Sequence, residues 1–161
     1  MSDDVEPLVI RHALGWDGVL NPTRDDILRV LEDIESGACA RPEFSIEQLK
    51  NVESAIVDGR RVLRYARRGC AAFAATFYHD DDTVSWYVTF RNSTNPQWAL
   101  STGTSDQQFI DGILCGAPFK LRNDCAVSIQ DTLDALVYFA SYRERSPQHA
   151  WIPEPESWIL S

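Results

Sequence analysis

The residues best suited to chemistry in this chain are its histidines, and their spacing forms no catalytic or metal-binding motif. His12, His79 and His149 lie far apart, and no HExxH, P-loop, GxGxxG or GxSxG pattern is present. A lone histidine is usually a surface or structural residue. The sequence therefore predicts no catalytic residue, no metal ligand and no cofactor, which is typical of a protein that is not an enzyme.

The four cysteines also lack the spacing of a metal site. Cys39, Cys70, Cys115 and Cys125 form no CxxC pair, and their neighbours are mostly small or apolar. This pattern predicts buried thiols in a reducing compartment. Two alternatives stay open, because partners can meet in space without being close in sequence: a disulfide, or a cysteine nucleophile activated by a distant histidine.

The most concentrated negative charge is the run Asp80, Asp81 and Asp82. Three adjacent carboxylates repel one another, so the tip of an exposed turn is the least costly place for them. Such a tip is either simply solvated, or it enters a basic cleft of a partner and imitates phosphate charge. Together with Asp106 and Asp111, these residues are our candidates for partner binding, on the grounds of charge and expected exposure.

A second cluster is positively charged. It consists of five arginines within nine residues: Arg60, Arg61, Arg64, Arg67 and Arg68. They could contact an anion or a nucleic acid, but the acidic character of the chain favours the solvated edge of a hairpin. The hydroxyl-rich run 102–105 lacks the lysine of a phosphate-binding loop and is expected to be an ordinary loop.

The overall charge excludes some classes of function. The chain has 161 residues with 24 acidic and 15 basic side chains, which gives a formal net charge of −9. Direct binding of nucleic acid requires a basic surface, so this class is not expected. The acidity fits a basic protein partner, although many cytosolic proteins are simply acidic. The acidic N-terminus and the absence of a long apolar run predict a cytoplasmic protein without a membrane partner.

Two helices are expected to flank the chain's central part. Thr23 can cap the first, where Asp25 and Asp26 lie near the positive end of the helix dipole. Ser128 can cap the second, and beyond it an extended tail carries Trp151 and Trp158. The apolar stripes that define the two helices are Ile27, Val30, Leu31 and Ile34, ending at Gly37, and Ile129, Leu133, Leu136, Val137 and Ala140.

The region between the helices has the patterns of β-structure. Residues 71–78 and 84–90 predict two antiparallel strands joined by a polar connection, with Trp86 on the buried face. Asp58-Gly59 between β-branched residues predicts a hairpin. Shorter strands are expected at 8–10, 98–102 and 119–121.

Two segments carry signals other than strand. Ser45 and Gln48 have the spacing of a capping box, which predicts a short helix or turn. Gly112, Gly116 and Pro118 interrupt the region 103–123, so its pattern is less clear, apart from the short strand expected at 119–121. The complete pattern predicts an α+β fold: a central antiparallel sheet with an N-terminal and a C-terminal helix packed on it, in one domain over residues 1–161.

The order of these elements resembles the Imm1-type immunity proteins, which protect bacteria from polymorphic toxins, often nucleic-acid deaminases. Three parts carry the likeness: Trp16 in a Gly-Trp-Asp-Gly turn before Pro22-Thr23 and the first helix, the central β region up to Trp98 and the Gly103 loop, and the ending from Val127 through Arg145-Ser146-Pro147 to Trp151. Many members have a glycine before the final turn, where this sequence has residues 143–146.

The resemblance implies that the protein binds a cognate toxin domain stoichiometrically and blocks its active site. A toxin that acts on nucleic acid tends to have a basic cleft, to which an acidic inhibitor is steered. The alternative is a small enzyme or ligand-binding domain with a pocket in the aromatic β region. A third possibility, a subunit of a larger assembly, predicts a large apolar patch and self-association.

Overall fold

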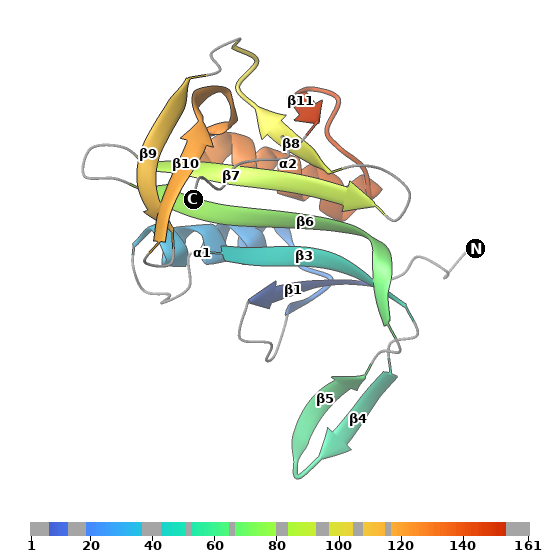
Figure 1. The fold of residues 1–161 in the computed structure, drawn as a ribbon. Helices are drawn as coiled ribbons and strands as arrows, with labels where there is room; N and C mark the ends of the chain where they lie inside the picture. Colours follow the sequence, from blue (N-terminus) through green and yellow to red (C-terminus); the bar gives the residue numbers. More distant parts are fainter. Residues whose placement is uncertain are drawn as a thin grey trace.

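The computed structural model describes residues 7–12, 19–36, 43–50, 53–64, 67–79, 84–92, 97–104, 108–114 and 117–153. Within these ranges the chain forms two α-helices, one short 3₁₀ helix and eleven strands. The predicted α+β class is therefore confirmed. Most of the strands belong to one large sheet, which runs through the middle of the molecule (Figure 1).

The large sheet has seven strands, and every neighbouring pair is antiparallel. From one edge to the other, the strands are β11 (Ala150–Pro153), β8 (Trp98–Ser101), β7 (Val84–Asn92), β6 (Arg67–His79), β3 (Glu43–Lys50), β1 (Leu8–His12) and β2 (Val19–Leu20). The predicted pairing of 71–78 with 84–90 is confirmed, because β6 and β7 pair from Ala71–Asn92 to His79–Val84.

Two separate hairpins accompany this sheet. In one, β4 (Glu53–Val57) pairs with β5 (Arg60–Arg64), as the Asp58-Gly59 pair predicts. In the other, β9 (Phe109–Leu114) pairs with β10 (Ala117–Arg122), and η1 (Asn123–Cys125) follows. Figure 1 shows β9–β10 crossing one end of the large sheet, where β9 contacts β6, whereas β4–β5 projects away from it.

The first helix, α1 (Arg24–Glu35), begins where its capping residues predict. Thr23 Oγ1 accepts a hydrogen bond of 3.2 Å from the backbone N–H of Asp26, and the Asp26 carboxylate accepts one of 2.9 Å from the N–H of Thr23. This reciprocal pair satisfies two N–H groups that the helix leaves without a partner. Ile27, Leu31 and Ile34 form the buried stripe.

The second helix, α2 (Ile129–Tyr142), is likewise capped as predicted. Ser128 Oγ accepts a hydrogen bond of 3.1 Å from the N–H of Asp131. Leu133 and Leu136 are buried as expected, and the core also takes in Phe139. The helix ends at Arg143, which has the left-handed conformation with φ of 62°.

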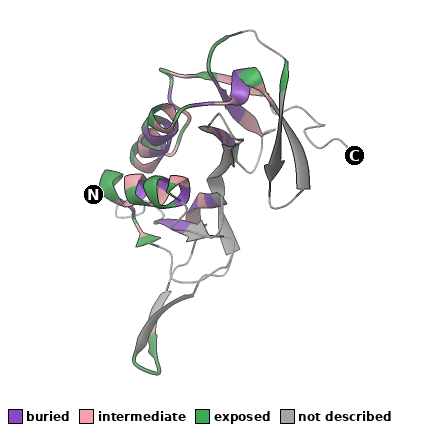
Figure 2. Ribbon diagram, turned by 90° about the vertical axis from the view of Figure 1, so that its left-hand side faces the viewer, coloured by how far each residue is buried: buried purple, intermediate pink, exposed green. Residues whose placement is uncertain are grey.

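The core lies between the large sheet and the helices. Figure 1 shows both helices behind the sheet, and Figure 2, turned by 90°, shows them side by side at one side of it. Trp86 is completely buried as predicted, and its ring meets Phe44 of β3 edge to face at 6.4 Å. Phe90 meets Phe139 of α2 in the same way at 6.0 Å. The aromatic β residues thus pack within the sheet and against α2.

One predicted segment differs from the structure. Ser45 and Gln48 lie in β3 and not in a helix or turn: Phe44 and Ile46 alternate toward the core, and the strand is paired on both sides. A capping pattern has no effect when the residues that follow it are stabilised in a sheet.

Two further strands lie where the sequence is less clear or only extended. β9 forms despite Gly112, and β10 contains the predicted strand at 119–121; Pro118 of β10 lies opposite Ile113 in a two-stranded ribbon, where a residue without an N–H can be accommodated. The tail after α2 is extended as predicted, and its residues Trp151 and Ile152 form part of β11, which pairs with β8.

Among the described residues, no helix combines the length and the apolar character that crossing a membrane requires. Cys125 is a buried thiol, as predicted. The turn around Trp16, the stop at Gly37, and Cys39 and Cys115 lie outside the described ranges.

Candidate interaction surface

The acidic residues that the sequence singled out are only partly within the described structure. Asp80, Asp81, Asp82 and Asp106 lie outside it. Asp111 lies in β9, where its Cα is paired with that of Lys120 in β10. The candidate surface is therefore built from other residues, on the projecting hairpin and on the two helices.

The hairpin β4–β5 exposes apolar residues near its tip. Ile56 is 72% exposed and Val57 is 39% exposed. In the strand register, Ile56 lies opposite Arg61 and Val57 lies opposite Arg60. The side chains of the arginine cluster lie outside the described part of the structure, so its predicted role as a solvated hairpin edge stays a prediction.

The turn of this hairpin is suited to hold its two strands in register. Asp58 and Gly59 both have positive φ, 52° and 76°, as a type I′ turn requires. Its twist matches that of the flanking strands, so the turn favours the hairpin geometry without help from the rest of the protein. The tip is therefore a defined structure and not an irregular loop.

The hairpin forms its own two-stranded sheet, separate from the large one (Figure 1). An isolated two-stranded hairpin is at best marginally stable in water, and it usually needs a third strand or a packing surface. A partner protein that covers Ile56 would supply that surface. This is the strongest indication of an interaction site among the described residues.

The helices provide a second feature, which we call the acidic helical face. It consists of exposed carboxylates on neighbouring helices: Asp25, Glu32 and Asp33 of α1 and Asp134 of α2. α1 carries five acidic and two basic side chains, and α2 carries two aspartates and no basic residue. Hydrogen bonds from the backbone and side chain of Thr23 hold the pKa of Asp26 below its ordinary value, so this carboxylate is charged too.

The acidic residues of this face could be recognised in the sequence, because both helices and their apolar stripes were predicted. Their remaining positions must face away from the core, and most charged ones are acidic. The adjacency of α1 and α2, however, depends on tertiary packing. The exposed carboxylates of the two helices therefore belong to neighbouring elements of the fold.

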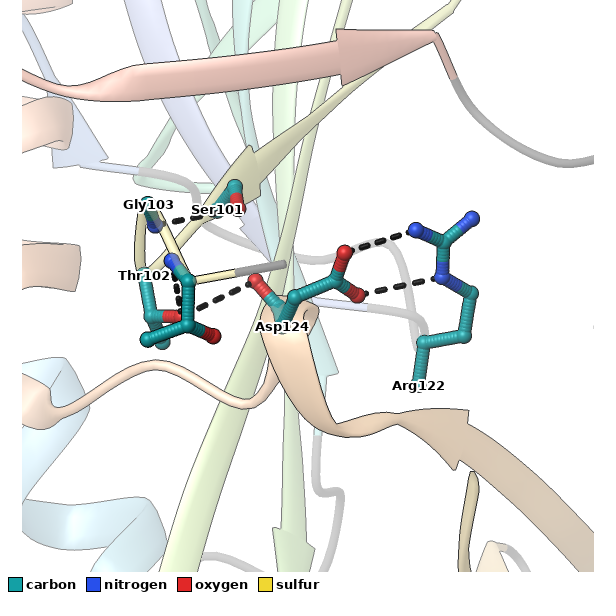
Figure 3. Close-up of polar contacts among 6 residues, drawn as sticks. Ser101, Thr102, Gly103, Arg122 and Asp124 are labelled. Atoms are coloured by element: carbon teal, nitrogen blue, oxygen red, sulfur yellow. Dashed lines mark hydrogen bonds and ion pairs between the residues drawn. The ribbon is translucent and has the colours of Figure 1, made fainter. Parts of the chain in front are cut away.

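The predicted loop at 102–104 is confirmed, and it is tied to β10 through Asp124 (Figure 3). The backbone carbonyl of Asp124 accepts a hydrogen bond of 2.8 Å from the Thr102 N–H. Its buried carboxylate accepts two bonds from Arg122, of 3.0 Å from Nε and 2.6 Å from Nη2. Because each polar group is used internally, this cluster serves to fasten the loop.

The aromatic β region does not line a ligand pocket in its described part. Trp86, Phe90 and Phe44 are buried in the core. Trp86 Nε1 also donates a hydrogen bond of 2.7 Å to Glu35 of α1. These side chains fill the space between the sheet and the helices.

Comparison of the chain with models of known protein families, with characterised proteins and with solved structures finds no match. The functional argument therefore depends on the exposed hairpin, the acidic helical face and the elements that position them.

Proposed function

We propose that this protein is a cytoplasmic immunity protein of the Imm1 type, which binds a cognate bacterial toxin one to one and occludes its active site. The toxin is expected to be a nucleic-acid deaminase with a basic cleft. In this proposal the central sheet, with the N-terminal and C-terminal helices packed on it, is a rigid single-domain scaffold. The hairpin β4–β5 and the acidic helical face are the binding elements.

The observation that carries the proposal is the exposure of Ile56 on a hairpin that stands apart from the large sheet. A large aliphatic side chain at the tip of a preformed turn is suited to enter a pocket of a partner and to be desolvated there. In the free protein this side chain gains little from burial, because 72% of it is exposed. A binding role therefore explains a feature that stability does not.

The acidic helical face supports the proposal through charge. Asp25, Glu32, Asp33 and Asp134 are exposed, and two arginines on α1 offset them only in part. An acidic surface accelerates association with a basic cleft and disfavours acidic competitors. Nucleic-acid enzymes need basic clefts to bind their substrate, so the acidic helical face fits that class of target.

The proposal is tested by co-expression with the protein encoded by the neighbouring gene, because immunity and toxin genes are expected to lie side by side. If the neighbour is a toxin, its expression alone arrests growth, and this chain restores growth and co-purifies with it at a ratio of one to one. A harmless neighbour that does not co-purify would argue against the immunity function.

Variants of the hairpin separate binding from folding. Ile56→Asp places a charge at the tip and is expected to abolish rescue, while the thermal unfolding temperature changes little because the residue is exposed. Tyr142→Asp is the matched control, since Tyr142 is 64% exposed but lies at the end of α2. Rescue by Tyr142→Asp with failure of Ile56→Asp supports binding through the hairpin.

A further inference from the structure

The fold brings together three potential metal ligands that are far apart in the sequence: Asp131, Asp134 and His149. Asp131 and Asp134 are three residues apart on α2 and so share a face of the helix. After α2 the chain runs back, so that His149 lies beside the helix just before β11. One ligand atom from each residue lies within 4.8 Å of the other two.

The contact between histidine and aspartate has the length of a loose ion pair, which would form if the imidazole were protonated. His149 Nε2 and Asp131 Oδ1 are 3.8 Å apart, beyond the reach of a hydrogen bond. Two ligand atoms on a tetrahedral zinc ion, each about 2.1 Å from the metal, are separated by about 3.4 Å. The observed spacing is thus too long for a hydrogen bond and close to that of two atoms sharing an ion.

The histidine ring is held in an orientation that suits a metal ligand. Its Nδ1 lies 2.9 Å from the hydroxyl oxygen of Ser146, which is 2% exposed. The same oxygen accepts a hydrogen bond of 3.3 Å from the N–H of Gln148. When Nδ1 donates to Ser146, the lone pair of Nε2 faces Asp131; metal-bound histidines commonly have such a partner on the other ring nitrogen.

Ser146 is itself fixed by other contacts. Its backbone carbonyl accepts a hydrogen bond of 2.9 Å from the indole Nε1 of Trp151 in β11. On the helix, Gln130 Nε2 donates a bond of 2.9 Å to Asp134 Oδ1, which restrains that carboxylate. The His149 ring is therefore held by Ser146 and the Asp134 carboxylate by Gln130, while their ligand atoms lie within 4.8 Å of each other.

The geometry points to a surface site for a divalent transition metal at Asp131, Asp134 and His149, with zinc as the ion that suits it best. One imidazole and two carboxylates are ligands that zinc accepts, whereas an imidazole is a poor ligand for calcium or magnesium. Water would complete the coordination. The ion would join the segment after α2 to the beginning of that helix, independently of whether the protein binds a toxin.

Sequence patterns do not reveal this site, because its ligands are not close together along the chain. His149 lies 15 residues after Asp134, which matches no standard ligand spacing. The distance is closed by the left-handed residue that ends α2 and by the return of the chain toward β11. Only the tertiary structure places the imidazole beside the two carboxylates.

The test is a calorimetric titration of the full chain with zinc chloride under reducing conditions. We expect one zinc ion per chain, and binding weaker by about tenfold or more in Asp134→Asn and in His149→Ala. Asp134 is exposed, so Asp134→Asn is expected to fold normally. It therefore tests the site even if His149→Ala disturbs folding. Asp25→Asn, an exposed carboxylate on α1, is the matched control and should bind zinc as the wild type does.

Cobalt provides a second readout, since the chain also has four cysteines. Cobalt bound by oxygen and nitrogen ligands lacks the sulfur-to-metal charge-transfer band that thiolate ligands produce. The site is supported if bound cobalt gives an absorption spectrum without this band and if that spectrum is absent in Asp134→Asn. A thiolate band, equal zinc binding by the variants and the wild type, or no zinc binding at all would each overturn it.

Discussion

The indole N–H of Trp86 donates a hydrogen bond of 2.7 Å to the carboxylate of Glu35, which is 51 residues away in the sequence. The tryptophan lies near the beginning of β7 and is completely buried, while Glu35 is the last residue of α1. The bond joins the end of the helix to the core. It also satisfies the one polar atom of a side chain that is otherwise surrounded by apolar groups.

Removal of this acceptor should destabilise the fold. Glu35→Ala leaves the buried indole N–H of Trp86 without this partner and is expected to lower the free energy of unfolding by about 1–3 kcal/mol. Glu35→Gln keeps an oxygen in the same place and should cost less. Urea unfolding of the two variants checks this. Equal loss in both would show that charge, and not the acceptor, is the important property.

The cap of α1 should make stability depend on pH. The pKa of Asp26 is lowered in the folded state, mainly by the hydrogen bond from the Thr23 N–H, so its contribution is present above the ordinary value of 3.8. The contribution is lost as the pH falls through the lower folded-state pKa. The difference in unfolding free energy between wild type and Asp26→Asn should therefore shrink from pH 6 toward about pH 2. A difference that does not vary with pH would contradict this.

The end of α2 offers a test of backbone strain at Arg143. Its φ of 62° is readily adopted by glycine but costs other residues about 1 kcal/mol. Arg143→Gly and Arg143→Ala both delete the side chain, whose Nη1 donates to the carbonyl of Ala140. The glycine variant is expected to be more stable than the alanine variant by about 1 kcal/mol in thermal unfolding. The reverse order would show that the variants do not keep the left-handed cap.

The ion pair of Arg122 and Asp124 should matter more than a surface pair. Asp124 is 3% exposed and receives two hydrogen bonds from the arginine, which raise the pKa of Arg122. Arg122→Ala leaves a buried carboxylate without its charged partner and is expected to cost about 3 kcal/mol in urea unfolding. Arg91→Ala, at an exposed arginine on β7, is the control and should change stability by less than about 0.5 kcal/mol. Similar losses in both would contradict a special role for the pair.

Local signals in the sequence predicted the elements that depend on local interactions. Thr23 and Ser128 cap their helices because the capping bonds involve residues only three positions away. Asp58-Gly59 forms its hairpin because the turn conformation belongs to those two residues. For these elements, spacing and residue type were sufficient.

Other parts depended on contacts between distant segments. Ser45 and Gln48 have a helix-start pattern, yet pairing with β1 and β6 holds them in a strand. The candidate surface shows the same limit: the hairpin was predicted, but its separation from the large sheet is a property of the whole sheet order. Likewise, His149 meets Asp131 only because the chain returns along α2. No pattern within a short window contains that information.

The central claim, that the protein binds its partner through the tip of β4–β5, is tested most directly by calorimetric titration with the purified product of the neighbouring gene. Wild type and Tyr142→Asp should bind one to one with equal affinity, and Ile56→Asp should bind about 30-fold or more weakly, as expected when an anchor contributing about 2 kcal/mol is lost. Equal affinity of Ile56→Asp and the wild type would contradict the account, because the exposed isoleucine would then have no part in binding.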